Sequence, residues 1–321
     1  MIGTFGRRLA ATGAILFAAQ MSIAQAQETL KIAAGQRGNW DSSVPEIGER
    51  AGIMKKHGLK LDILYTQGSG ETQQAVISGA VDVGVAIGTL GAIGAFSKGA
   101  PIRIIGAQST GAGDLYWYAR SESGITSITG NQGKTIAFST NGSSTHTVVK
   151  AFTDEKGSRA TPTATGSPSA TLTQVMSGQV DIGWAAPPFG IELLDQKKIR
   201  VLATGNDTSL KEQTVRVLAT NVDRLKNKKD AIERFVQAYR ETVDYMYTNP
   251  DSLKVYSSWL NIPEELARRT RDDFFLRAAI EPDTIIGLDK IVQDAVAFKF
   301  ANAVLTKEQL AELIQIPARR K

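Results

Sequence analysis

The feature that most constrains the fold of this chain is an 11-residue segment that occurs twice. Residues 76–86 read VISGAVDVGVA, and residues 175–185, 99 positions later, read VMSGQVDIGWA. Each copy is typical of a helix end, a glycine that closes the helix in the left-handed conformation, and a short apolar strand. A glycine- and serine-rich helix start precedes each copy, at 68–70 and 166–168. Unless this is a chance match of common helix and strand patterns, it predicts two similar α/β lobes that face each other.

The composition excludes several kinds of site. The chain has 321 residues, enough for about two domains of ~150 residues, and its 42% hydrophobic and 21% charged residues are ordinary for globular proteins. It contains no cysteine, which removes disulfides, thiolate metal sites and cysteine nucleophiles. With only two histidines, a histidine-rich metal site is not expected either. We therefore expect neither a metal nor a cofactor.

Residues 1–26 have the pattern of a secretory signal peptide. Arg7 and Arg8 precede a mostly apolar stretch, residues 9–23, and an Ala-X-Ala cleavage signal ends at Ala26. The alternative, a membrane anchor, needs about 20 apolar residues, more than this stretch provides. We expect cleavage after Ala26 and a periplasmic protein. Removal of the two arginines lowers the formal charge from +5 to +3, and without clustered basic faces we expect no nucleic-acid partner.

The order of patterns along the mature chain predicts how the lobes are built. Strands and helices alternate from residue 29 to 107, which is typical of an open, mostly parallel sheet, and the same alternation restarts after Gly130. Extended segments at 114–120 and 213–220 can cross between the lobes, and helices follow from residue 223 onward. We therefore expect a discontinuous first lobe, residues 27–113 and 215–321, and a second lobe, residues 114–214.

Ligands of such sheets bind beyond the carboxyl ends of the strands, where the next helices begin. The loops at these positions are 35–41, 68–70, 87–89 and 139–146. The last reads STNGSSTH, and hydroxyl and N–H groups that converge at a helix start can bind anionic oxygens. A capped surface turn is the alternative for this loop.

The chain resembles the substrate-binding proteins of ABC importers of the nitrate/sulfonate/taurine type, which share their fold with binders of thiamine-pyrimidine precursors. The matching segments cover about residues 29–220 in order and are 51–61 (AGIMKKHGLKL), 68–70 (GSG), 78–84 (SGAVDVG) and 177–182 (SGQVDI). The resemblance implies a type II periplasmic binding protein fold: two Rossmann-like α/β lobes joined by two hinge crossovers, with a helical C-terminal segment. It also implies a small-molecule ligand in the cleft, closure on binding, an inner-membrane ABC permease as partner, and a monomer.

Carried over by position, the resemblance implies ligand-binding residues on the loops already singled out. From the first lobe and the second lobe these are Gln36, Trp40, Ser69, Gly70, Gly88, Thr89, Asn141, Ser143, Ser144, Ala186 and Pro187. Trp117 and Trp184 are further candidates for aromatic walls, with a core or hinge role as the alternative. Whether these two, Arg37 or His146 face the cleft stays open at this point.

The functional expectation is a receptor that captures a small organic anion, an aliphatic sulfonate, a taurine-like compound or a carboxylate, between helix N-termini and hydroxyls. One alternative is a receptor for a neutral heteroaromatic compound stacked on Trp40. Another is an exported enzyme. Enzymes of this fold, the desulfinases and the pyrimidine-precursor synthases, rely on cysteines or histidine clusters that this chain lacks, so we expect no enzymatic activity.

Overall fold

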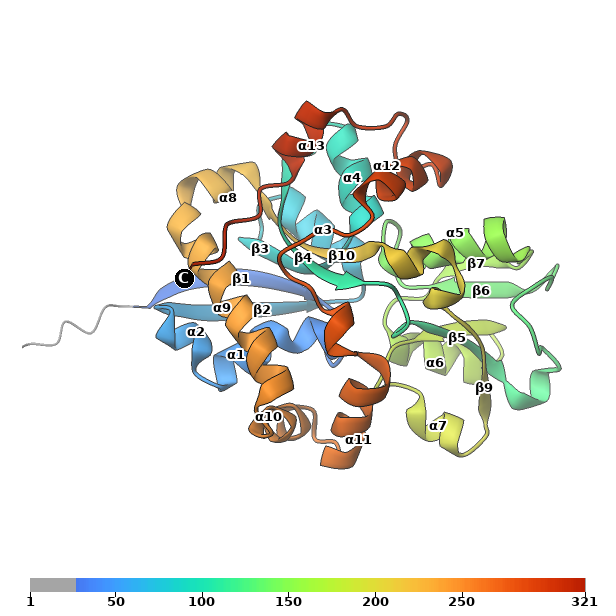
Figure 1. Ribbon diagram of the computed structural model, residues 1–321. Coiled ribbons are helices and arrows are strands. Elements are labelled where there is room, and N and C mark those ends of the chain that lie inside the picture. The colour runs from blue at the N-terminus through green and yellow to red at the C-terminus, as the bar shows by residue number, and fades with distance from the viewer. Residues whose placement is uncertain (1–26, 321) are drawn as a thin grey trace, which may run out of the picture.

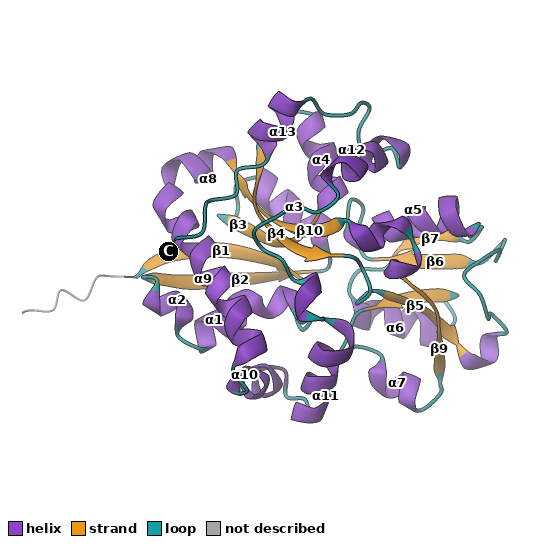
Figure 2. Ribbon diagram, viewed as in Figure 1, coloured by secondary structure: helices purple, strands orange, loops and turns teal. Residues whose placement is uncertain are grey.

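Two five-stranded mixed sheets form the framework of the computed structural model, which describes residues 27–320 (Figures 1 and 2). The predicted signal peptide lies outside the described residues. The first sheet has the order β2-β1-β3-β10-β4. Its strands are β1 (Glu28–Gly35), β2 (Leu59–Thr66), β3 (Val83–Gly88), β4 (Ile102–Thr110) and β10 (Thr214–Asn221).

The second sheet repeats this arrangement with the order β7-β6-β8-β5-β9. Its strands are β5 (Tyr116–Arg120), β6 (Thr135–Phe138), β7 (Thr161–Ala164), β8 (Ile182–Ala185) and β9 (Ile199–Thr204). In each sheet the strand in the fourth position is antiparallel to both neighbours. This strand, β10 or β5, is the first one that the chain forms after it crosses from the other sheet. The predicted fold of two α/β lobes joined by two crossovers is confirmed.

Helices cover both faces of the first sheet. One face carries α1 (Val44–Arg50), α2 (Ile53–Lys56), α9 (Lys229–Thr248) and α10 (Asp251–Leu260), whose apolar side chains form one core. The other carries α3 (Ser69–Ile77), α4 (Thr89–Ser97), α12 (Leu288–Ala297) and α13 (Lys307–Leu313). We call this sheet with its helices lobe I; α8 (Val222–Asn227) and α11 (Glu264–Arg269) also belong to its C-terminal part.

Lobe II is the second sheet with α5 (Ser144–Lys156), α6 (Pro168–Met176) and α7 (Ile191–Asp195). Figure 1 shows the two lobes side by side, with β10 and β5 running in opposite directions out of the region between them. The exact residue boundaries predicted for the lobes stay a prediction. Across residues 27–320, no helix combines the length and the apolar character that a membrane span needs.

The two copies of the sequence repeat occupy equivalent places and use an aspartate in the same way. Asp82, before β3, accepts a hydrogen bond from the backbone N–H of Lys31 on β1 (2.8 Å). Asp181, before β8, accepts one from the backbone N–H of Thr135 on β6 (2.9 Å). Each carboxylate thus ties the start of one strand to its parallel neighbour. The repeat is therefore a structural unit and not a chance match.

Candidate ligand-binding site between the lobes

The N-termini of α3 and α4 in lobe I meet the loop that precedes α5 in lobe II. The backbone N–H of Gly70 donates to the hydroxyl of Thr140 (3.0 Å), and the backbone N–H of Ser144 donates to the hydroxyl of Ser69 (3.4 Å). We call this contact, between residues 68–70 and 88–91 of lobe I and residues 139–144 of lobe II, the interlobe seam. It brings together seven of the predicted site residues: Ser69, Gly70, Gly88, Thr89, Asn141, Ser143 and Ser144.

Glycine is required at the seam because the backbones approach so closely. A Cβ atom on Gly70 would lie 2.1 Å from the carbonyl oxygen of Asn141, and one on Gly91 would lie 2.2 Å from that of Gly142. No side chain fits at these distances. Gly91 is absent from the predicted site, although a glycine inside a helix, where it is unfavourable, is a sequence signal for close approach.

Three helix N-termini, of α3, α4 and α5, meet at the seam, so the positive ends of three helix dipoles lie there. Ser143 caps α5 by accepting a hydrogen bond from the backbone N–H of His146 (3.0 Å). Within residues 27–320, the buried hydroxyl of Thr89 and the buried carbonyl oxygen of the Gln73 side chain have no hydrogen-bond partner. Buried polar groups without a partner are costly, and the Thr89 hydroxyl lies within the seam itself.

His146 supports, as a neutral side chain, the part of the seam that precedes α5. We call these residues, 139–144, the seam loop. Its Nδ1 accepts a hydrogen bond from the backbone N–H of Gly142 (3.2 Å), and its ring stacks on Phe138 with centroids 4.5 Å apart. Burial, with a contribution from the positive charge of Lys150, lowers the pKa of His146 to about 4. At neutral pH the imidazole therefore holds the loop without adding positive charge.

The loop after β1 contributes a second group of polar atoms. Gln36 has a positive φ of 42° and donates through Nε2 to the carbonyl oxygen of Gln67 (3.2 Å). Its side-chain oxygen accepts a hydrogen bond from Asn39 (3.4 Å). Arg37 turns away from this group, because its guanidinium lies 5.1 Å from the centre of the Trp259 ring.

The aromatic candidates lie in cores. Trp40 is fully buried, donates through Nε1 to the hydroxyl of Tyr247 (3.1 Å), and packs edge-on against Tyr256 with ring centroids 4.8 Å apart. Trp117 and Trp184 are also fully buried, in lobe II. In this conformation none of the three offers an accessible ring face to a ligand. Ala186 and Pro187, which follow β8, are buried as well.

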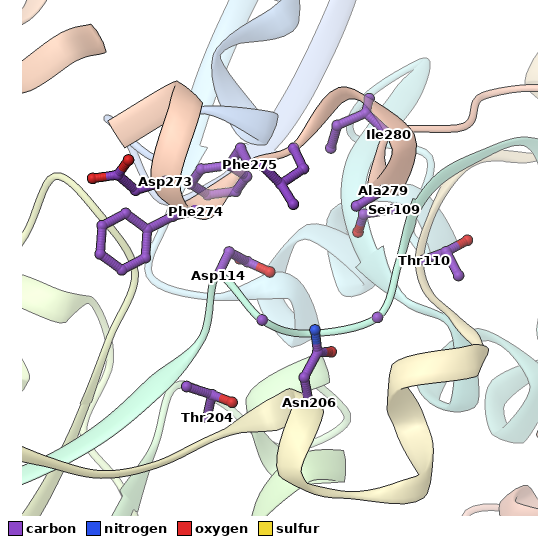
Figure 3. A pocket seen from close by; sticks show the side chains of 13 residues that line it. Ser109, Thr110, Asp114, Thr204, Asn206, Asp273, Phe274, Phe275, Ala279 and Ile280 are labelled. Carbon is purple, nitrogen blue, oxygen red and sulfur yellow. The ribbon is translucent and has the colours of Figure 1, made fainter. Parts of the chain in front are cut away.

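A cavity of about 290 Å³ lies where both crossovers meet a segment of the C-terminal part (Figure 3). We call it the hinge cavity. Its lining residues are Ser109, Thr110, Gly111, Gly113, Asp114, Thr204, Asn206, Asp273, Phe274, Phe275, Leu276, Ala279 and Ile280. No local pattern in the sequence marks this cavity, because three segments far apart along the chain form it.

A buried charge network borders the hinge cavity. Arg216 on β10 donates through Nη1 to the carboxylate of Asp114 (2.8 Å), lies 3.1 Å from a carboxylate oxygen of Asp41, and donates through Nε to Ser109 (2.9 Å). Burial raises the pKa of Asp41. Burial alone would lower the pKa of Arg216, but attraction to Asp114 and Asp41 raises it overall. The network fixes the first crossover, through Asp114, to the sheet of lobe I.

The described residues hold no group of three or more His, Asp or Glu side chains arranged to hold a metal ion.

Comparisons with solved structures identify the fold. The chain is similar to the alkanesulfonate-binding protein SsuA from Xanthomonas axonopodis pv. citri bound to MOPS, with 17% identity, a TM-score of 0.71, and coverage of 90% of this chain and 98% of that one. It is also similar to the periplasmic aliphatic sulphonate-binding protein SsuA from Escherichia coli (18% identity, TM-score 0.66, coverage 92% and 94%). A third similar structure is the periplasmic nitrate-binding protein NrtA from Synechocystis PCC 6803, with 14% identity, a TM-score of 0.68, and coverage of 89% of this chain and 85% of that one.

At these identities the structures establish the periplasmic binding protein fold and not the ligand. No curated protein matches the chain. The sequence profile of the NMT1/THI5-like family matches residues 47–253, more than half of the chain and parts of both lobes. The chain therefore belongs to the NMT1/THI5-like family.

Proposed function

We propose that this protein is the extracytoplasmic substrate-binding component of an ABC importer and that it captures a small organic anion, a sulfonate or a carboxylate, between its lobes. The fold supports a binding role, and the similar structures named above are sulfonate- and nitrate-binding proteins. The partner would be an inner-membrane permease that recognises the closed form. The predicted signal peptide is consistent with a periplasmic location.

The observation that carries the proposal is the convergence of three helix N-termini on the seam. Backbone N–H groups and the positive ends of helix dipoles bind anionic oxygens without a cationic side chain. No seam residue is Lys or Arg, and the partnerless hydroxyl of Thr89 lies at the start of α4. Once the lobes move apart, a sulfonate or carboxylate would accept a hydrogen bond from this hydroxyl and from the N–H groups that the seam contacts release.

Binding would require the lobes to open and close. The seam contacts are made between the lobes, so opening of the lobes would break them. The crossovers at 111–115 and 205–213 are the segments that can bend between the sheets. The alternative of a stacked heteroaromatic ligand is less well supported, because Trp40 is engaged by Tyr247 and Tyr256.

A thermal-shift screen of the mature chain, residues 27–321, tests the proposal. The panel contains sulfonates, carboxylates, inorganic oxyanions, amino acids and pyrimidines. A ligand at about 100 times its Kd should stabilise the protein by about 2.7 kcal/mol, which raises Tm by a few degrees. We expect stabilisation by sulfonates or carboxylates. A panel in which no anion raises Tm, or only pyrimidines do, would contradict the proposal.

A matched pair of variants locates the binding site. Thr89→Val removes the partnerless hydroxyl with little change in shape and should weaken binding of the anion found in the screen about tenfold, as expected for one lost hydrogen bond to a charged group. Thr173→Val, on α6 and exposed, is the control and should bind as the wild type does. Equal affinities of the two variants would place the anion elsewhere.

A further inference from the structure

We propose that lobe I carries a second binding site, separate from the space between the lobes, for an organic anion with an apolar body. The site is a groove of about 530 Å³ between α8, the start of α9 and the C-terminal tail, residues 314–320. We call it the tail groove, and its volume lies within the usual range of small-molecule sites. Its lining residues are Arg103, Val222, Leu225, Lys226, Lys229, Glu233, Gln315, Ile316 and Pro317.

The tail groove lies at the end of lobe I that is opposite the seam. β10 starts beside the seam, where Arg216 pairs with Gly88, and ends at Asn221, next to Val222 of the groove. From residue 216 to residue 222 an extended strand rises about 20 Å. Figure 1 shows the C-terminal tail, in red, running from α13 past α8 and away from lobe II. The groove is therefore independent of the ligand proposed between the lobes.

Hydrogen bonds hold the C-terminal tail in place as one wall of the groove. The backbone N–H of Gln315 donates to the carbonyl oxygen of Ile104 on β4 (2.8 Å). Arg240 on α9 donates through Nη2 to the carbonyl oxygen of Pro317 (2.6 Å). Ile316 lies between these two anchors. The wall is therefore formed before a ligand binds, so that binding does not carry the entropic cost of ordering it.

Apolar side chains on both walls leave surface that a ligand can cover. Val222 and Leu225 come from α8, and Ile316 and Pro317 come from the C-terminal tail. All four are only partly buried. An apolar group in the groove would remove this surface from water, which is favourable. A small inorganic anion would leave most of it uncovered, so the groove favours an anion with an apolar body.

Cations outnumber carboxylates along the groove. Arg103, Lys226 and Lys229 line it together with one acid, Glu233. Glu233 is already paired with Arg320 (3.1 Å), and the amine of Lys229 lies 3.9 Å from it, too far for a hydrogen bond. Among residues 27–320, no carboxylate forms an ion pair with Lys226. The two lysines can therefore pair with an anionic head.

Arg103 adds a positive charge that is fixed in position. Its side chain is only 11% exposed, donates through Nη1 to the carbonyl oxygen of Ile102 (2.9 Å), and lies 5.3 Å from the centre of the Phe96 ring. Its carboxylate partner, Glu312, is more than half exposed. Because water screens an exposed carboxylate, Glu312 only partly offsets the attraction of Arg103 for a further anion.

Calorimetric titration of the mature chain, residues 27–321, with three probes tests the proposal. Octanoate has an anionic head and an apolar body, acetate has the head alone, and octanol has the body without the charge. We expect octanoate to bind at least about tenfold more tightly than either, since it alone can contact both the cations and the apolar walls. Equal affinity for octanoate and octanol would overturn the role of the cations, and equal affinity for octanoate and acetate that of the walls.

Two exposed lysines provide a matched pair of variants. Lys226 lines the groove, whereas Lys55, in α2, does not. Lys226→Glu should weaken octanoate binding by at least about tenfold, because it replaces an attractive charge with a repulsive one. Lys55→Glu makes the same change in net charge and should bind octanoate as the wild type does. Lys226→Arg, which keeps the charge, should retain binding.

The folding control is the Tm without octanoate, which should be the same for all three variants and the wild type. If Lys226→Glu binds octanoate as the wild type does, the anion lies elsewhere and the proposal fails, while the receptor function between the lobes stands. A wild type that binds no octanoate would also overturn it. If vesicles of phosphatidylglycerol bind instead, and Lys226→Glu abolishes that binding, the groove serves a membrane surface and not a small molecule.

Discussion

His146 links the stability of the seam loop to pH. Its pKa in the folded protein is about 4, against an ordinary value of 6.5, because burial and the positive charge of Lys150 disfavour the protonated ring. Between these values the side chain of His146 binds more protons in the unfolded chain than in the folded one. Its contribution to folding stability is therefore fully present above pH 6.5 and is lost as the pH falls toward 4. The seam loop is thus weakened by acid.

We expect His146→Gln to reduce the loss of stability between pH 7 and pH 5, measured by urea unfolding at both values. His57→Gln is the control, since His57 lies at the end of α2, pairs with Glu241, and leaves His146 in place. If the His146 variant loses as much stability over this interval as the wild type does, the imidazole is not responsible.

The roles of single residues could be predicted where neighbours in the chain decide them. Ser143 was expected at a helix start, and it caps α5 through a hydrogen bond three residues away. The resemblance implies Trp40 as a site residue after the first strand. Its packing against Tyr247 and Tyr256, more than 200 residues later, has no local signal in the sequence. The ion pair between Asp114 and Arg216, which lie 102 residues apart, likewise has no local signal in the sequence.

At the scale of elements, the approach of α4 to the seam loop depends on a missing side chain. An alanine at Gly91 would place its Cβ 2.2 Å from the carbonyl oxygen of Gly142, which pushes the two lobes apart unless the backbone of the seam shifts locally. We expect Gly91→Ala to favour the open form, seen as a larger radius of gyration in X-ray scattering and weaker ligand binding, while α4 itself is not destabilised.

Gly35→Ala is the matched control for this variant. The nearest heavy atom to a Cβ at Gly35 lies 3.7 Å away, which is ordinary contact. We expect this substitution to leave the scattering curve unchanged. An unchanged curve for Gly91→Ala as well would show that the seam can yield locally without opening the lobes.

The elements themselves were predictable to the extent that local pattern and repetition specify them. The repeat indicated that α3–β3 and α6–β8 are equivalent, and both crossing strands were expected from their extended pattern. The place of β10 between β3 and β4 could not be predicted, since pairing between distant strands leaves no local periodicity. The hinge cavity depends on this placement and was missed for the same reason.

At the scale of the whole molecule, an ion pair bridges the lobes on the side away from the seam. Arg269 on α11 makes two hydrogen bonds to Asp195 on α7, at 2.7 and 2.8 Å, and the pairing lowers the pKa of Asp195. Both side chains are exposed, so solvent and salt screen the pair. It therefore adds a weak, salt-sensitive link between the lobes.

We expect Asp195→Asn to speed dissociation of the ligand modestly at low salt and to have no effect at high salt, measured by stopped-flow fluorescence. Asp251→Asn is the control, because Asp251 pairs with Lys254 inside α10 and does not bridge the lobes. An effect of Asp195→Asn that persists at high salt would mean that the carboxylate has another role.

The exchange of strands between the two sheets sets the order in which they can be completed during synthesis. All five strands of the second sheet lie between Tyr116 and Thr204. The first sheet needs β10, which sits between β3 and β4 and is the last strand to emerge. A nascent chain that ends at residue 213 holds every strand of lobe II, whereas β4 of lobe I still lacks the neighbour that joins it to the rest of its sheet. The lobe whose strands come first along the chain is therefore the one whose sheet is finished last.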